Sequence, residues 1–376
     1  MTNITRRRAL KAGGALFASG TIAGCLGSSS GDGSDDSTTV QTSFFVLTDF
    51  ARNITGDAAT VESLVPIGQH GHGWEPSAQV QRDAMQSDAV VYMGEGFQPW
   101  ADRMVKNVEQ DRPEITIVEA RRGVSLLSAP GHGDGHEGEH EAGNHDGDGH
   151  EEETNENQTD HGHEEGDHHD GNDHGGEIHG NETDGDQHDE SENGHDHGTS
   201  DPHFWLDPQR AKQAVSTIES GLSEMDGVSG ETLAGNADDF RNRLDELDST
   251  FESELESTER NAVLVAGHNA FQYLGERYGF EIHALTGLAP DSSPSPKDVQ
   301  RAQKLIEEHD IEHVLAPVFE SDRAAKQLVS ETDAKDHLSI TPIPSVTEAW
   351  NEKEWGYIEI MEEVNLPSLK TALGAK

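Results

Sequence analysis

The sequence predicts an α/β fold made of two similar lobes, each with a parallel sheet flanked by helices, joined by one long helix. Short apolar segments alternate with amphipathic ones from Thr38 onward, the alternation occurs twice, and a long charged helical pattern separates the two runs. Strands that alternate with helices favour a parallel sheet covered on both faces. A length of 376 residues is also too great for one typical domain.

The first run predicts the N-terminal lobe. We expect strands at residues 40–47, 59–64, 88–93 and 115–118, with a short helix between the first two. Apolar residues at helical spacing predict further helices near 76–87, 99–109 and 208–225.

The second run begins with the long helix, expected over residues 231–258. At 1.5 Å per residue this helix would be about 42 Å long, enough to run between two lobes. The C-terminal lobe then takes strands at 262–266, 282–285, 313–317 and 338–341, with helices at 269–278, 295–309, 322–332 and 355–373.

An insertion between Gly131 and Ser200 interrupts this pattern. It holds 14 histidines, 24 acidic residues and 16 glycines, but no Lys or Arg. Its only apolar side chains are Ala142 and Ile178, so it cannot offset the roughly 1 to 2 kcal/mol of backbone entropy per residue that folding costs. Neutral imidazoles beside carboxylates suit zinc, nickel or copper, and we expect the insertion to bind metal transiently. A solvated acidic linker is the alternative. The histidines are His132, His136, His140, His145, His150, His161, His163, His168, His169, His174, His179, His188, His195 and His197.

The N-terminus resembles an export signal. Thr5 to Lys11 reads TRRRALK, a twin-arginine pattern, and the 13 apolar and small residues from Ala12 to Gly24 are too few to span a bilayer of about 30 Å. The segment IAGC ends at Cys25, the only cysteine, and is similar to a lipobox. We therefore expect lipidation at Cys25 and a location on the outer face of the cell membrane.

The acidity of the chain limits its partners. Of the net charge of −47, −24 comes from the insertion and −23 from the rest. Nucleic acid is therefore excluded as an expected partner. This composition resembles that of proteins from extreme halophiles, where salt near 1 M reduces the Debye length to about 3 Å.

Three histidines outside the insertion occur where a strand or turn should end. They are His72 in HGHGWEP, His203 in DPHFWLDP and His268 in GHNAF. In open α/β sheets ligands bind beside the carboxyl ends of the strands, and three imidazoles meeting there would form a zinc site with a fourth position left open. His309 and His313 are instead expected to be surface or boundary residues.

Several motifs, in order, resemble the zinc and manganese receptors of ABC importers, the cluster 9 solute-binding proteins. The resemblance covers nearly all of residues 38–376. It rests on HGWEP, on DPHFWLDP, on GHNAFQYLGERYG and on the SPSPK block with the strand that follows it. A histidine-rich insertion before DPHFWLDP is what the zinc-selective branch carries.

The resemblance implies that His72, His203 and His268 bind Zn²⁺ between the lobes, and that an ABC permease is the partner. Thr341 stands where family members often have a ligating aspartate. Water is then our first expectation for the fourth ligand, with Glu348, His70 or an insertion residue as further candidates. We expect a monomer with no enzymatic activity.

The expected organisation is a signal over 1–25, a tether over 26–37, an N-terminal lobe over 38–130 plus 201–230, the insertion over 131–200, a connecting helix over 231–258 and a C-terminal lobe over 259–376.

Three other functions fit parts of the sequence. A manganese or other divalent-metal receptor of the same family is one alternative, and an extracellular metal buffer is another. The third is a zinc hydrolase, because residues 136–140 read HEGEH. That motif requires a helix to place both imidazoles on one face, and a glycine-rich acidic segment does not predict one.

Overall fold

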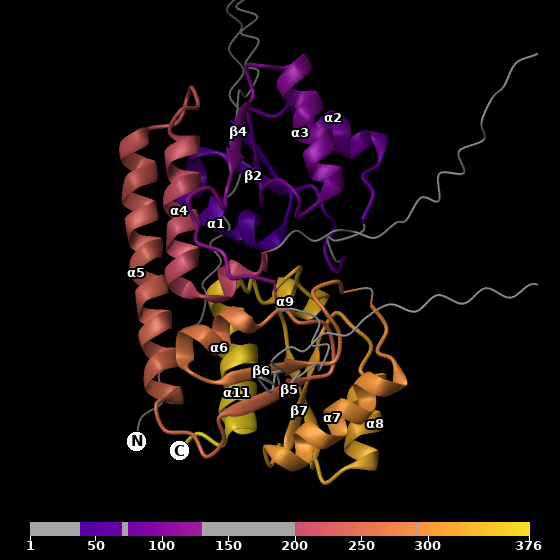
Figure 1. Cartoon of the computed structure of the whole chain (residues 1–376). Coiled ribbons are helices and arrows are strands. Elements are labelled where there is room, and N and C mark those ends of the chain that lie inside the picture. Colours follow the sequence, from indigo (N-terminus) through magenta and orange to yellow (C-terminus); the bar gives the residue numbers. More distant parts are fainter. Residues whose placement is uncertain (1–37, 70–73, 130–199, 291) are drawn as a thin grey trace, which may run out of the picture. The chain divides into compact units, whose positions relative to one another are not determined.

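The computed structural model describes residues 38–69, 74–129, 200–290 and 292–376, and shows two parallel four-stranded sheets (Figure 1). The strand order is β2-β1-β3-β4 in the first sheet and β6-β5-β7-β8 in the second, so both sheets share one topology. The predicted α/β fold with two similar lobes is therefore confirmed. The strands are β1 (Thr39–Thr42), β2 (Thr60–Ser63), β3 (Ala89–Tyr92), β4 (Thr116–Glu119), β5 (Ala262–Val265), β6 (Glu281–Ala284), β7 (His313–Pro317) and β8 (Asp336–Ile340).

Helices flank both sheets. They are α1 (Phe45–Thr55), α2 (Ala78–Gln86), α3 (Pro99–Asp111), α4 (Pro208–Leu222), α5 (Gly230–Leu255), α6 (Gln272–Tyr278), α7 (Pro296–Glu308), α8 (Arg323–Glu331), α9 (Glu348–Glu352), α10 (Tyr357–Ile360) and α11 (Leu366–Leu373). Short 3-10 turns occur at Gly56–Ala58 and Phe204–Leu206.

Each sheet is buried on both faces, as parallel sheets usually are. In β5, Val263 and Val265 join one apolar cluster whereas Leu264 faces another, formed with α7 and α8. In β3, Val90 faces the cluster formed with α2 and α3. The largest cluster contains residues of both lobes, from Val40 to Leu373, so the two sheets share a continuous apolar core.

The long helix α5 connects the lobes, as the sequence predicts. It packs against α1 and α4 on one side and against α6 and α11 further along (Figure 1). Asp248 of α5 accepts hydrogen bonds from Gln209 of α4 at 2.8 Å and from Arg277 of α6. One buried carboxylate thus joins α5 to elements of both lobes.

Two predicted elements differ in detail. The apolar run at 40–47 was expected to be one strand, but β1 ends at Thr42 and α1 begins at Phe45. The buried residues Val46, Leu47 and Phe50 have helical spacing, which an apolar run of this length conceals. The closing helix contains a π turn at Met361–Asn365, just before Pro367, whose ring lacks an N–H donor and clashes with the carbonyl of a regular helical turn.

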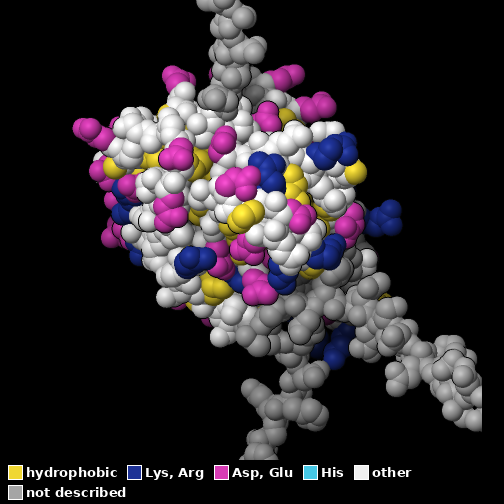
Figure 2. Space-filling view, turned by 90° about the horizontal axis from the view of Figure 1, so that it is seen from above, with side chains coloured by type: hydrophobic (Ala, Val, Ile, Leu, Met, Phe, Trp, Pro, Cys, Tyr) yellow, Lys and Arg dark blue, Asp and Glu magenta, His cyan; other side chains and the backbone are white. Residues whose placement is uncertain are grey.

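Acidic side chains are spread over the face seen in Figure 2, with Lys and Arg among them. Such mixed charge is typical of a solvated surface. Within the described ranges, no helix combines the length and apolar character that crossing a bilayer requires.

Candidate metal centre

The DPHFWLDP segment is held between the lobes by Trp205. The indole packs on Phe44 of the first lobe at a ring distance of 5.1 Å, and its Nε1 donates to the Pro342 carbonyl beyond β8 at 2.8 Å. The Tyr357 hydroxyl donates to the Trp205 carbonyl at 2.6 Å. Because Trp205 is fully buried, these contacts fix the backbone two residues after His203.

His203 is paired with a carboxylate. Its Nδ1 lies 2.8 Å from Oδ1 of Asp201, and the same oxygen accepts the His203 backbone N–H at 2.9 Å. The Asp201 carbonyl accepts a 2.6 Å hydrogen bond from the hydroxyl of Tyr273, on α6. Both His203 and Asp201 are buried, so the ring orientation is fixed by its partner rather than by solvent.

His268 is held in the same way on the second sheet. It follows β5, and Glu320 follows the neighbouring strand β7. Nδ1 of His268 lies 2.5 Å from Oε1 of Glu320, whose Oε2 accepts the His268 backbone N–H at 3.2 Å. Since β6 and β7 lie on opposite sides of β5, this is the point where the strand order reverses, the usual ligand position in open α/β sheets.

Gly267 makes the approach of Glu320 possible. A Cβ at this position would lie 2.5 Å from Oε2 of Glu320 and 2.6 Å from Cγ of Pro317. Those distances are well below van der Waals contact, so the carboxylate requires glycine here.

The imidazoles of His203 and His268 lie close together, with ring centroids 5.4 Å apart and ring planes tilted by 51°. An Nδ1–H that donates to a carboxylate selects the tautomer in which Nε2 carries the lone pair. Burial lowers the pKa of His203 by disfavouring its charged form, against the opposing effect of Asp201. The lowered pKa favours the neutral form of the His203 imidazole at pH 7. Carboxylate–histidine pairs of this kind typically orient metal ligands.

The predicted third histidine, His72, lies outside the described residues, as does His70. The residues on either side are anchored. Gly68 donates its N–H to Oγ of Ser345 at 2.8 Å, and the ring of Trp74 packs on Trp100 at 4.9 Å. The Ser345 contact ties residue 68 to the loop after β8.

The described residues on either side of the insertion lie near Asp201 and His203. Ser128 and Ser200 form an antiparallel bridge, and the Asp201 N–H donates to the Leu127 carbonyl at 2.8 Å. Leu127 in turn donates to the Tyr273 hydroxyl. The histidines of the insertion, the HEGEH motif and Cys25 lie outside the described residues, but the insertion rejoins the chain three residues before His203.

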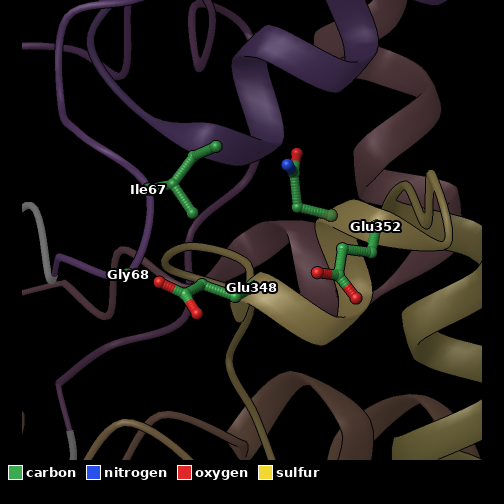
Figure 3. Close-up of a pocket in the computed structure, with 5 residues that line it drawn as sticks. Ile67, Gly68, Glu348 and Glu352 are labelled. Carbon is green, nitrogen blue, oxygen red and sulfur yellow. The ribbon is translucent and has the colours of Figure 1, made fainter.

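Glu348, a predicted candidate for the fourth ligand, lies in the C-terminal part of the chain beyond β8. It lines a pocket of about 410 Å³ with Ile67, Gly68, Asn351 and Glu352 (Figure 3). Glu348 is exposed at the start of α9.

Thr341 is buried and uses its hydroxyl to accept the Ile343 N–H at 2.9 Å. Its backbone is bonded to Asn365 in both directions, the N–H donating and the carbonyl accepting. Thr341 therefore has a structural role in the loop after β8.

Among the described residues, one group of three potential ligands lies with its atoms within 4.8 Å of one another: Glu281, His283 and His309. This group includes neither His203 nor Glu348. His309 was expected to be a surface or boundary residue, and His283 was not among the candidate site residues.

The carboxylates that bind the central histidines, Asp201 and Glu320, were not among the predicted site residues either. The proximity of Asp201 to His203 in DPH could have revealed the first, whereas Glu320 lies 52 residues from His268.

Comparison with known proteins identifies the family. The family model described as "ZnuA: Zinc-uptake complex component A periplasmic" matches residues 40–372. This chain belongs to the ZnuA family.

Two curated relatives show how far the ZnuA likeness extends. The chain is 27% identical over 336 residues to the zinc-binding lipoprotein AdcA of Streptococcus pneumoniae (strain ATCC BAA-255 / R6), covering 89% of this chain and 56% of AdcA. It is 26% identical over 358 residues to the high-affinity zinc uptake system protein ZnuA of Bacillus subtilis, covering 94% of each. The chain thus spans about half the length of the AdcA relatives that it matches.

Solved structures of the same kind support the fold. The Zn(II)-bound ZnuA-like domain of S. pneumoniae AdcA matches with a TM-score of 0.63 and 23% identity, over 90% of this chain and 99% of that domain. The metal-dependent lipoprotein YcdH from B. subtilis matches with a TM-score of 0.63 and 22% identity, over 90% of this chain and 99% of YcdH.

Proposed function

We propose that this ZnuA-family chain is an extracytoplasmic receptor that captures Zn²⁺ and delivers it to the permease of an ABC importer. One observation carries the proposal: His203 and His268 are buried with their ring centroids 5.4 Å apart, each with Nδ1 hydrogen-bonded to its own carboxylate. This arrangement presents two nitrogen lone pairs in fixed directions, and the relatives named above are described as zinc-binding or zinc-uptake proteins.

The proposed ligands are Nε2 of His203, Nε2 of His268 and a ring nitrogen of His72. The anchored residues Gly68 and Trp74 support the inclusion of His72, since they flank its segment. Zinc accepts imidazole nitrogens at about 2.0 to 2.1 Å and commonly keeps a fourth position for water. Water remains the proposed fourth ligand, ahead of Glu348 and His70.

Zinc is preferred over manganese because manganese favours oxygen ligands. Asp201 and Glu320 are the described carboxylates nearest the two rings, and both are bonded to Nδ1 atoms. They therefore act on the histidines and are not proposed as ligands. A manganese receptor remains the alternative.

The insertion is proposed to collect zinc weakly and to pass it to the central site. The Ser128–Ser200 bridge supports this role because it holds residues 128 and 200, on either side of the undescribed segment, near the Asp201–His203 pair. A metal buffer that uses the insertion alone would leave the carboxylate–histidine pairs without a purpose. No step of the proposed function requires catalysis.

The cellular setting is part of the same proposal. A lipid on Cys25 would hold the mature chain, as a monomer, on the outer membrane face, in a medium of high salt. The lobes are proposed to comprise residues 38–130 plus 201–230 and residues 259–376.

The test is a zinc titration of three proteins: the full chain, its His203→Ala variant, and a form in which a two-residue turn replaces residues 130–199. The Ser128–Ser200 bridge makes such a connection geometrically short. We expect the shortened form to keep one tight site and lose the weak ones, and His203→Ala to show the reverse. A shortened, folded form without a tight site would refute the proposal.

A further inference from the structure

We propose a second, exchangeable zinc site at the outer edge of the second sheet, formed by Glu281, His283 and His309. It goes beyond the receptor function and does not depend on it. The three ligand atoms lie within 4.8 Å of one another. Glu281 and His283 lie outside the motifs that carry the family resemblance, and His309 lies between the SPSPK block and β7.

Two of the ligands come from one strand. Glu281 and His283 are two residues apart on β6, the edge strand of its sheet, so they point to the same face. Oε2 of Glu281 lies 3.6 Å from Nε2 of His283. That nitrogen is buried, and within the described part of the chain it has no hydrogen-bond partner.

The third ligand comes from the end of a helix. His309 is the residue that terminates α7, and its backbone N–H donates to the Leu305 carbonyl at 3.0 Å. Its ring lies 5.0 Å from that of His283 at an angle of 44°. The end of α7 thus brings a second imidazole over the Glu281–His283 pair.

The chemistry of the set suits zinc. Two imidazoles and one carboxylate are a common zinc ligand set with a position left for water. Burial, followed by the nearby His309, lowers the pKa of His283, so its imidazole is neutral at pH 7. Zinc ligands at about 2.0 to 2.1 Å are roughly 3.4 Å apart in a tetrahedron, so the group must contract on binding. The exposed side chain of Glu281 can make that movement.

The surroundings predict weaker binding than at the central pair. Within the described ranges, no carboxylate is hydrogen-bonded to Nδ1 of His283 or His309. Arg301 is also close enough to lower the pKa of His283. The Glu281 side chain is 59% exposed. Zinc would therefore exchange readily with the solution.

The test is NMR of the full chain with ¹⁵N- and ¹³C-labelled histidine, titrated with chelator-buffered Zn²⁺. We expect the imidazole signals of His283 and His309 to shift together with one midpoint, after the first equivalent has bound. His309→Gln should raise the zinc midpoint of His283 at least about tenfold, and Glu281→Gln should raise it in the same direction.

His337→Gln is the matched control, since His337 is a partly exposed strand histidine outside the group, and it should leave both midpoints unchanged. The proposal is overturned if either signal fails to move up to millimolar free zinc, or if the two move with different midpoints. His203→Ala should leave these midpoints unchanged, so failure here is distinguishable from failure of the receptor function.

Discussion

The central histidine pair and the edge group differ in what holds the rings. His203 and His268 are at most 2% exposed, and each has a carboxylate on Nδ1. His283 and His309 are partly exposed, and the carboxylate near them, Glu281, faces Nε2 of His283 at 3.6 Å. In the first case the carboxylates fix the rings, whereas in the second the carboxylate is itself a prospective ligand. The comparison indicates that the affinity for zinc should depend more on whether carboxylates hold the imidazole rings in place than on the number of histidines.

The largest expected effect comes from removing a ring. His268→Ala should weaken the tightest zinc binding by well over 100-fold, because even loss of an orienting partner commonly costs about 10- to 100-fold. His283→Ala should leave that binding unchanged. Competition with a chromophoric chelator measures the zinc affinity of both variants. An equal loss of affinity in His268→Ala and His283→Ala would contradict the proposed difference between the two sites.

A smaller loss should follow removal of an orienting carboxylate. Glu320→Gln keeps the size of the side chain but replaces one of its two accepting oxygens with an NH₂ group. The side chain can then no longer accept from both the backbone N–H and Nδ1 of His268, so we expect zinc affinity to fall by about 10- to 100-fold. Glu331→Gln is the control, since Glu331 is exposed on α8. An unchanged affinity in Glu320→Gln would show that the hydrogen bonds to His268 are dispensable.

Gly267→Ala tests the same contact through the backbone. The added methyl would displace Glu320, so affinity should fall by about tenfold, with a loss of about 1 to 3 kcal/mol in the free energy of unfolding. Gly235→Ala adds a methyl where no atom lies within 4 Å, inside α5, and should stabilise the protein by up to about 1 kcal/mol. Zinc titration measures the affinity of both variants, and thermal melting measures their stability. Equal changes in affinity and stability in the two variants would contradict the role of Gly267.

The smallest effect is on the pH dependence of the metal-free protein. Burial lowers the pKa of His203 in the folded state, so the unfolded chain takes up a proton first as pH falls below about 6.5. Stability should therefore decrease with acidification in that range, and His203→Gln should remove this contribution.

Thermal melts between pH 7.5 and 5.5 measure the difference. Asp49, whose pKa burial raises to about 6, acts in the opposite direction in both proteins and cancels between them. Identical pH slopes for the variant and the parent would contradict the account.

Much of the fold was predictable because each lobe repeats one alternation of apolar strands and amphipathic helices. The placement of His203 and His268 at a turn and a strand end was also predictable from the sequence. The pairing of His268 with Glu320 was not, because it depends on the order of β5 and β7 in the sheet rather than on sequence spacing.

The edge group was missed for a similar reason. Alternation along β6 could have placed Glu281 and His283 on one face, but nothing in the sequence shows that α7 ends above them. The expected strand at 40–47 failed because four apolar residues in succession fit a strand or a buried helix equally well.

The most direct test of the central claim is anomalous diffraction at the zinc edge from crystals of the zinc-loaded protein. We expect the strongest peak about 2.0 to 2.1 Å from Nε2 of both His203 and His268, with a nitrogen of His72 as the third ligand. A strongest peak at the Glu281 group, or one that contacts only one of His203 and His268, would contradict the account.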